Sequence, residues 1–452
     1  MRRNFRQRVV YAWELPSIMR KHIYTGMMGG IYITLVSGLL FVTYGNQIGM
    51  TPFLWGLMGG ISSFVLAAQL LSALLTQRLG KRKLVWFASS MACRVIRLLA
   101  ILASLWLWHT GSHLAAAALI AGVCLSNLFG AVSAPPWMSW LADLIPEEEH
   151  GGFWGRRSAW VEVSIACAIL PASFLVDHVP GAWKMPSLMA VFMAATAIGV
   201  VDLVIHGTLP EPEMAIPEQD HFLAQILAPV RDRGFRPWLL FNLFWTFSMT
   251  LGGSLSMIYF VEDLGLSRNL LGGGIVLIIF PMLGGILTGA RSGRMVDRRG
   301  AKPVLWWGHL FWATLPAFWV FATPRSALVW IGLASLVSGT ASRAATIAAS
   351  KIVTRYPPPE HVAMYVAVSS CLGSLAAGIG AVAAGALLRG LDGWCVEVWG
   401  LALVPFHVLF IASVVLRFAS TLLIARIPEA HVAPSPAPAA EGVGEEPVAV
   451  SE

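Results

Sequence analysis

The sequence predicts an all-α membrane protein with twelve transmembrane helices in two pseudo-symmetric six-helix bundles. Three observations lead to this fold class: the composition, the length of the apolar blocks and a pair of repeated loops. Of the 452 residues, 57% are apolar and only 12% are charged, which is about half of the ~25% usual in soluble domains. So little charge could not cover the surface of a soluble chain of this length. The composition also excludes intrinsic disorder for the bulk of the chain.

The apolar residues fall in blocks that are long enough to cross a bilayer. A helix rises ~1.5 Å per residue and the hydrocarbon core is ~30 Å thick, so each crossing needs ~20 residues. Because lipid offers the backbone no hydrogen-bond partner, blocks this long are expected to be helices. Twelve such blocks lie at 23–46, 53–76, 84–108, 113–134, 158–177, 186–207, 238–261, 270–291, 303–322, 326–349, 363–388 and 397–425.

The two ends of the chain are polar. The first block follows MRRNFRQRVVYAWELPSIMRKH, which carries six Lys/Arg residues. This start is similar to that of a signal peptide, but the block after it is too long and lacks a convincing cleavage site. We therefore expect a cytoplasmic segment over 1–22 and an uncleaved first helix. The tail over 428–452 is rich in Pro, Ala and Glu, and we expect it to be a disordered cytoplasmic tail.

Positive charge is distributed unevenly across the membrane. If the blocks alternate in direction, 23 Lys/Arg residues lie on the side of the N-terminus and 4 on the other side. This bias predicts that both termini are cytoplasmic, and we expect a multi-pass protein of the bacterial inner (plasma) membrane. It also accounts for the net charge of +7 without a nucleic-acid partner.

The chain divides into two halves that repeat each other. The longest internal polar connection, 208–237, is expected to be a cytoplasmic linker between bundles at 23–207 and 238–427. The loop around Arg78 and Gly80 returns around Arg298 and Gly300, and Asp-x-x-Pro-x-x-Glu-His at 143–150 returns as Thr-x-x-Pro-x-x-Glu-His at 354–361. Duplicated halves are common in secondary transporters, whose site lies between the repeats near the midplane.

These loops resemble the signature of the major facilitator superfamily, and the resemblance covers the chain apart from its tail. That signature is Gly-x-x-x-Asp-Arg-x-Gly-Arg/Lys-Arg/Lys. The copy from Gly293 to Lys302 matches at every position except Ala301, whereas the first copy has Ala73 in place of the glycine and Gln77 in place of the aspartate. The loop from Asp143 to Gly155 is similar to a second family pattern, with His150 in place of an arginine.

The resemblance implies alternating access between the two bundles and a latch on their cytoplasmic side. Glycines there allow tight reversals between packed helices, and an aspartate can accept hydrogen bonds from helix N-termini or pair with arginine. The other interpretation is that these loops only mark topology. The latch residues that the resemblance implies are Arg78, Gly80, Asp143, Gly293, Asp297, Arg298 and Gly300.

Ionisable residues at membrane depth are costly, so each is a functional candidate. Arg343 lies on the tenth block, and the family's first, fourth, seventh and tenth helices line its central cavity. A structural ion pair is the alternative for Arg343, and helix packing is the alternative for uncharged polar residues. The substrate-contact candidates are Tyr32, Asn127, Asn242, Trp245 and Arg343.

Arg94 and Arg97 share one face of the third block, which braces the bundle in the family. We expect a buried pair with Glu162 or Asp202, or snorkelling, and the sequence leaves open whether these arginines are structural or functional.

These observations predict a monomeric secondary active or facilitative transporter of a small solute, anionic or polar, because Arg343 is the one clear charge on the cavity helices. The sequence leaves the substrate, the direction and coupling to a proton or ion open. The alternative is a non-transporting receptor or scaffold of the same fold. A membrane-embedded enzyme is disfavoured, since the eleven histidines and five cysteines show no metal-ligand spacing. We therefore expect no metal, no cofactor and no catalytic residue.

Overall fold

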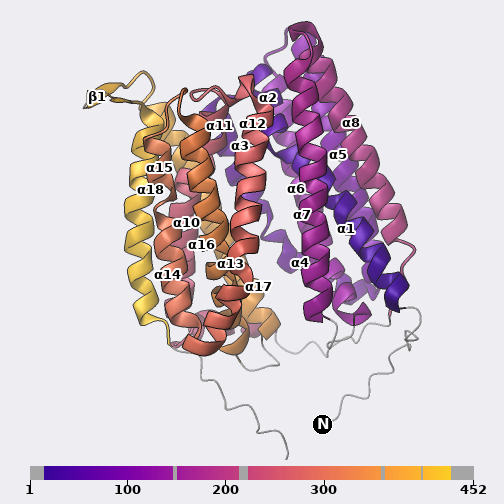
Figure 1. Ribbon diagram of the computed structural model, residues 1–452. Coiled ribbons are helices and arrows are strands. Elements are labelled where there is room, and N and C mark those ends of the chain that lie inside the picture. Colours follow the sequence, from indigo (N-terminus) through magenta and orange to yellow (C-terminus); the bar gives the residue numbers. More distant parts are fainter. Residues whose placement is uncertain (1–14, 146–149, 213–221, 358–361, 399–400, 429–452) are drawn as a thin grey trace, which may run out of the picture.

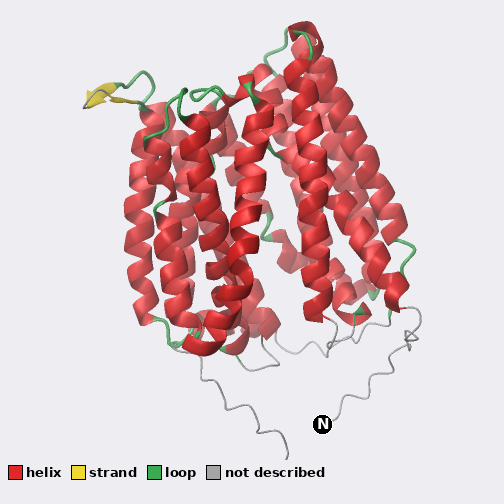
Figure 2. Ribbon diagram, viewed as in Figure 1, coloured by secondary structure: helices red, strands yellow, loops and turns green. Residues whose placement is uncertain are grey.

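The computed structural model describes residues 15–145, 150–212, 222–357, 362–398 and 401–428. Almost all of this chain is helical (Figure 2), and the helices form two groups that stand side by side (Figure 1). The start of α1 and the end of α18 lie on one side, which we call the terminal side, and the other side is the distal side. The predicted N-terminal segment over 1–14 and the tail beyond 428 lie outside the described residues.

The first bundle contains six crossings, and two of them are built from a pair of helices. Its elements are α1 (Leu15–Ser37) with α2 (Leu39–Gln47), α3 (Pro52–Val65) with α4 (Ala68–Leu79), α5 (Arg82–His109), α6 (Ala115–Leu144), α7 (His150–His178) and α8 (Gly181–His206).

The second bundle follows a short helix, α9 (Phe222–Arg231), in the predicted linker. Its elements are α10 (Arg236–Gly253) with α11 (Ser256–Val261), η2 (Leu266–Arg268), α12 (Leu270–Gly274) with η3 (Ile275–Ile279) and α13 (Phe280–Arg299), α14 (Ala301–Ala313) with α15 (Leu315–Val320), α16 (Ala327–Arg355), α17 (Val362–Gly390), β1 (Val396–Val398), β2 (Leu401–Leu403), α18 (Pro405–Leu422) and η4 (Leu423–Arg426).

The predicted twelve crossings are confirmed for the described residues. Ten helices are long and apolar enough to span a bilayer. The two remaining crossings are α3 with α4 and α14 with α15, and each is divided by a short interruption. In the second case Pro316 follows the interruption at the start of α15, where the missing N–H of proline costs nothing.

The two bundles repeat the same packing scheme, which confirms their pseudo-symmetry. In the first bundle, the first crossing packs against the fifth and sixth, and the fourth against the second and third. The second bundle has the same pairs, with α10 against α17 and α18, and α16 against α13 and α14. The contacts between bundles also match, since α3 packs on α17 and α7 packs on α12.

Glycines bring α3 and α17 into backbone contact between the bundles. A Cβ at Gly56 would lie 2.8 Å from the carbonyl oxygen of Ala381, and a Cβ at Gly385 would lie 3.2 Å from that of Phe53. Such distances are too short for a side chain, so glycine permits this close approach.

Among the described residues, the hydrophobic cluster that joins the two bundles lies toward the distal side. One cluster contains residues of both bundles, including Leu39, Ile169 and Val276. Two further clusters lie near the terminal side, one within the second bundle around Trp238 and one within the first around Trp140. The bundles are therefore packed together at the distal side and have separate cores at the terminal side.

Several boundaries differ from the sequence prediction, and two of the differences involve proline. The predicted helix over 397–425 begins only at Pro405, and Val396–Val398 pairs with Leu401–Leu403 as an antiparallel hairpin. Proline is favoured in the first helical turn because its φ is already helical, so it sets this start. The predicted block 113–134 continues to Leu144 through Pro135 and Pro136, because membrane helices tolerate proline where neighbouring helices satisfy the freed backbone groups.

Candidate functional site

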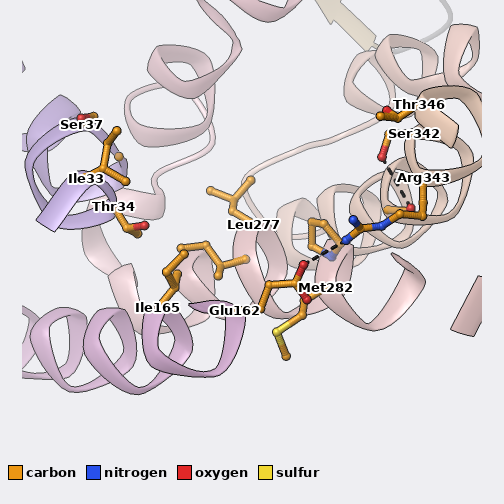
Figure 3. Close-up of a pocket in the computed structure, with 14 residues that line it drawn as sticks. Ile33, Thr34, Ser37, Glu162, Ile165, Leu277, Met282, Ser342, Arg343 and Thr346 are labelled. Carbon is orange, nitrogen blue, oxygen red and sulfur yellow. Dashed lines mark hydrogen bonds and ion pairs between the residues drawn. The ribbon is translucent and has the colours of Figure 1, made fainter. Parts of the chain in front are cut away.

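A cavity of about 550 Å³ lies between the two bundles (Figure 3). Its size falls within the ~300–1,000 Å³ typical of small-molecule sites. It is bounded by α1 and α7 of the first bundle and by η3, α13 and α16 of the second. The lining residues are Ile33, Thr34, Ser37, Gly38, Glu162, Ile165, Leu277, Ile278, Pro281, Met282, Gly339, Ser342, Arg343 and Thr346.

Irregular backbone shapes the cavity on both sides. On the first bundle, α1 gives way to α2 at Gly38, whose φ of −97° and ψ of −146° are not helical. A Cβ at Gly38 would lie 2.7 Å from the carbonyl oxygen of Thr34. On the second bundle, the π-helical segment Ile275–Ile279 supplies Leu277 and Ile278 to the wall. Single π-turns inside α-helices are found frequently at functional sites.

An ion pair crosses the cavity from one bundle to the other. Arg343 Nη2 on α16 donates to Glu162 Oε1 on α7 at 2.9 Å, and the two side chains point toward each other in Figure 3. The side chains are 44% and 27% exposed. Ion pairs this exposed contribute only ~0–1 kcal/mol, so solvent or a solute can replace this one at little cost. The pair also balances the charge of Arg343, so the cavity has no net charge from these two groups.

The remaining lining combines hydroxyls with apolar side chains. Ser342 Oγ donates to the carbonyl oxygen of Gly339 at 3.5 Å. Within the described chain, the hydroxyls of Thr34, Ser37 and Thr346 have no protein hydrogen-bond partner. The cavity can therefore offer hydrogen bonds to a polar solute and an apolar wall to its body.

The five predicted substrate contacts do not converge, and Arg343 is the member of the set that lines the cavity. Tyr32 is 6% exposed, and its ring lies under the Arg94 guanidinium, with Cζ 5.1 Å from the ring centroid. Asn127 accepts a hydrogen bond from Arg97 Nη2 at 2.5 Å and donates to Ser62 Oγ at 2.8 Å. Both residues face the interior of the first bundle.

The two candidates in the second bundle lie among its packed helices. Asn242 Nδ2 donates to the carbonyl oxygen of Ser369 on α17 at 3.0 Å. Trp245 is 5% exposed and packs edge-on against His309, with ring centroids 4.4 Å apart. Contact of either residue with a solute stays a prediction.

The two arginines of α5 take different partners. Arg94 Nη2 pairs with Asp202 Oδ2 on α8 at 2.5 Å, and the two side chains are only 11% and 8% exposed. Arg97 instead donates to Ser126 and Asn127 on α6. The sequence suggested Asp202 or Glu162 as the partner of these arginines. In the structure Asp202 pairs with Arg94, whereas Glu162 pairs with Arg343.

The predicted latch is described only in part. Gly80, with a φ of 62°, ends α4, and Gly300, with a φ of 86°, separates α13 from α14. Both turns need this left-handed backbone, which glycine adopts without strain. Gly293 has open space around its Cα, and Arg298 is exposed. The side chains of Arg78, Asp143 and Asp297 lie outside the described residues, so the latch stays a prediction.

A second contact between the bundles also was not predicted from the sequence. Asp177, near the end of α7, accepts hydrogen bonds from the backbone N–H groups of Leu270 at 3.0 Å and Leu271 at 2.8 Å. These are the first residues of α12 in the other bundle, and a carboxylate is favourable at a helix N-terminus. The signal in the sequence was an acidic residue at the end of an apolar block, which gives no hint of its partner.

Comparison with known proteins gives one family and several solved structures of similar fold. A sequence model described as "Major Facilitator Superfamily" matches residues 23–335. A mutant of the nucleoside transporter NupG has a TM-score of 0.67 at 12% identity, covering 90% of this chain and 99% of that chain. A second structure, of the nucleoside transporter NupG, has a TM-score of 0.63 at 12% identity, with coverage of 90% and 98%.

A third structure is a bacterial homolog of the human lysosomal transporter Spinster, in an inward-facing and unoccupied conformation. It has a TM-score of 0.59 at 16% identity, covering 92% of this chain and 95% of that chain. At these identities the likeness is one of fold. A search among curated proteins found no match.

Proposed function

The chain belongs to the Major Facilitator Superfamily and is a membrane transporter by family, and we propose that it moves a small, neutral polar solute through the cavity between its bundles by alternating access. The observation that carries this proposal is the ion pair between Arg343 and Glu162, which joins the two bundles across that cavity. A solute that competes for these groups would bind at the seam and couple its own binding to the motion of the bundles.

The asymmetry of the core supports the alternating-access part of the proposal. The bundles share one hydrophobic cluster at the distal side and have separate clusters at the terminal side. With both termini in the cytoplasm, as the 23 to 4 distribution of Lys/Arg favours, this is a state open to the cytoplasm. In this proposal the moving units are 23–207 and 238–427, and 208–237 links them.

The chemistry of the cavity favours a neutral polar solute over an anion. The sequence alone allowed either, because Arg343 was the one clear charge on the cavity helices. Glu162 balances that charge at 2.9 Å, so an anion would have to displace a carboxylate. Hydroxyls and an apolar wall suit a solute with a flat apolar part and several hydroxyls. Nucleosides have this chemistry, and two structures of similar fold are of a nucleoside transporter, so uridine is the first probe.

The test is uptake of labelled uridine into sealed vesicles that contain the purified protein, with and without an imposed proton gradient. We expect uptake above that of empty vesicles, and a thermal shift of the detergent-purified protein by uridine, because a bound ligand stabilises the native state. Arg343→Gln should weaken this stabilisation, whereas Arg325→Gln, at an exposed position outside the cavity, should not.

Other results would overturn the proposal in distinct ways. Uptake of organic anions but of no neutral solute would reject the neutral substrate class and retain the transporter. Absence of any flux, in a protein that still binds solute, would favour the receptor or scaffold alternative. If uridine uptake depends on the imposed proton gradient, transport is coupled to protons. The family match and the transporters of similar fold favour a transporter over the membrane-embedded enzyme.

A further inference from the structure

A second cavity, of about 410 Å³, lies inside the first bundle. It is enclosed by α1, α5, α6, α7 and α8, and it borders the central cavity at Ile33, which lines both. Its chemistry comes from two arginines, one aspartate and three aromatic rings. These are Trp86, Arg94, Trp137, Arg157, Asp202 and His206.

Glycines of α1 make room for the charged groups of this cavity. A Cβ at Gly26 would lie 2.8 Å from Arg157 Nε and Nη2, and a Cβ at Gly29 would lie 3.2 Å from Asp202 Oδ2. Both distances are shorter than ordinary van der Waals contact, so a larger residue would push the charged groups aside. The glycines of the sequence GMMGG at 26–30 therefore keep space open beside polar atoms.

The charges in this cavity do not balance. Asp202 pairs with Arg94, and among the described residues no group forms a hydrogen bond or ion pair with Arg157. Its guanidinium lies over the rings of Trp137 and Trp154, with Cζ 5.5 Å and 5.3 Å from their centroids. Asp202 also interacts electrostatically with Arg157, so two cations share one anion and the cavity has one excess positive charge. Excess charge inside a membrane-embedded bundle is costly.

Buried polar atoms around the cavity also lack partners. Arg94 is 9% exposed, and its Nη1 has no hydrogen-bond partner, nor does the Nε of Arg157. Neither ring nitrogen of the fully buried His22 has one, and this ring packs on that of His206 at 4.6 Å between centroids. Unpaired buried N–H groups are rare in folded proteins, because each loses its hydrogen bonds to water without replacement.

We propose that this cavity binds the monoanion of an aromatic carboxylic acid. The carboxylate would accept hydrogen bonds from the guanidinium of Arg157, whose fork of donors matches a carboxylate, and would supply the missing negative charge. The aromatic ring would lie against Trp86 and Trp137. The site goes beyond the proposed transport function, because it lies within one bundle and needs no contact across the central cavity.

Binding of benzoate to the full-length protein in detergent, measured by titration calorimetry and by thermal shift, tests this inference. Benzamide has the same shape without the charge and is the matched control ligand. We expect benzoate to bind and stabilise the protein and benzamide to do neither. Arg157→Gln should weaken benzoate binding roughly tenfold or more, since it removes a charge-assisted hydrogen bond. Arg20→Gln, at an exposed position of α1, should leave it unchanged.

Two further arms test whether the positive charge of Arg157 is available to a ligand. Asp202→Asn removes the one carboxylate of the cavity and should tighten benzoate binding. If benzoate binds only to the Asp202→Asn variant and not to the natural protein, Asp202 already neutralises both Arg94 and Arg157. The inference is then wrong. Equal affinity for benzoate and benzamide, or displacement of benzoate by uridine, would also overturn it. Uridine uptake into vesicles is measured separately, so that failure of the anion site leaves the transport proposal untouched.

Discussion

The Arg94–Asp202 pair and the Arg343–Glu162 pair each hold helices together, and they differ in their surroundings. Arg94 and Asp202 join α5 to α8 within one bundle, with side chains 11% and 8% exposed. Arg343 and Glu162 join the two bundles, with side chains 44% and 27% exposed. We therefore expect the buried pair to be a fixed contact and the exposed pair to be replaceable by solvent or solute. In this proposal, burial rather than charge separates a structural pair from one that takes part in transport.

The largest expected effect comes from breaking the buried pair. Asp202→Ala leaves Arg94 buried without a counter-charge, and removing one partner of a buried pair typically costs ~3–5 kcal/mol. We expect a large fall in the unfolding temperature of the purified protein. The double variant Arg94→Met/Asp202→Leu should recover most of that loss, because an apolar pair of similar volume has no desolvation cost. A stability of the single variant equal to that of the natural protein would show that this pair is not structural.

A smaller effect is expected at the distal contact between the bundles. Asp177→Ala removes the acceptor of two backbone N–H groups at the start of α12, and loss of such a helix cap costs ~0.5–2 kcal/mol. Because this contact exists only when the distal side is closed, its loss should favour the state that is open there.

The distal opening can be measured by labelling. In a cysteine-free background, Leu271→Cys should react faster with a membrane-impermeant thiol reagent when Asp177 is replaced by alanine. Asp392→Ala, at an exposed distal position, is the control. An unchanged labelling rate would mean that Asp177 does not help to close the distal side.

The exposed pair should contribute least to stability and most to turnover. Glu162→Gln removes an ion pair worth ~0–1 kcal/mol, so the unfolding temperature should hardly change, whereas uridine uptake should fall. The reversed pair Glu162→Arg/Arg343→Glu should restore part of the uptake. A loss of stability as large as that of Asp202→Ala would remove the distinction between the two pairs.

Much of this arrangement could be predicted from the sequence, and the parts that could not have a common physical reason. Block length fixes how often the chain crosses the membrane, and charge bias indicates its sides, but neither says which helices are neighbours. Arg343 was therefore predicted for the cavity on the family's helix order, while Glu162 was considered as a partner of Arg94 and Arg97. In the structure, Asp202 forms an ion pair with Arg94, and Glu162 forms one with Arg343.

Arg157 illustrates the same limit. The block predicted at 158–177 leaves Arg157 just outside the helix, because hydropathy does not locate a helix start to within a turn. In the structure, α7 begins at His150, so Arg157 lies two turns inside the helix and faces the cavity of the first bundle. The hairpin of Val396–Leu403 was missed because a short apolar run is compatible with helix or strand.

The central claim is that the two bundles move against each other about the cavity that holds Arg343 and Glu162. It is tested most directly by distance measurements between spin labels on both sides of the membrane in one cysteine-free protein. One label pair, at Arg20 and Arg298, spans the terminal side, and another, at His113 and Arg325, spans the distal side; all four positions are exposed. On addition of a transported solute, the terminal distance should shorten and the distal distance should lengthen. Distances that both stay constant, or that change in the same direction, would contradict the account.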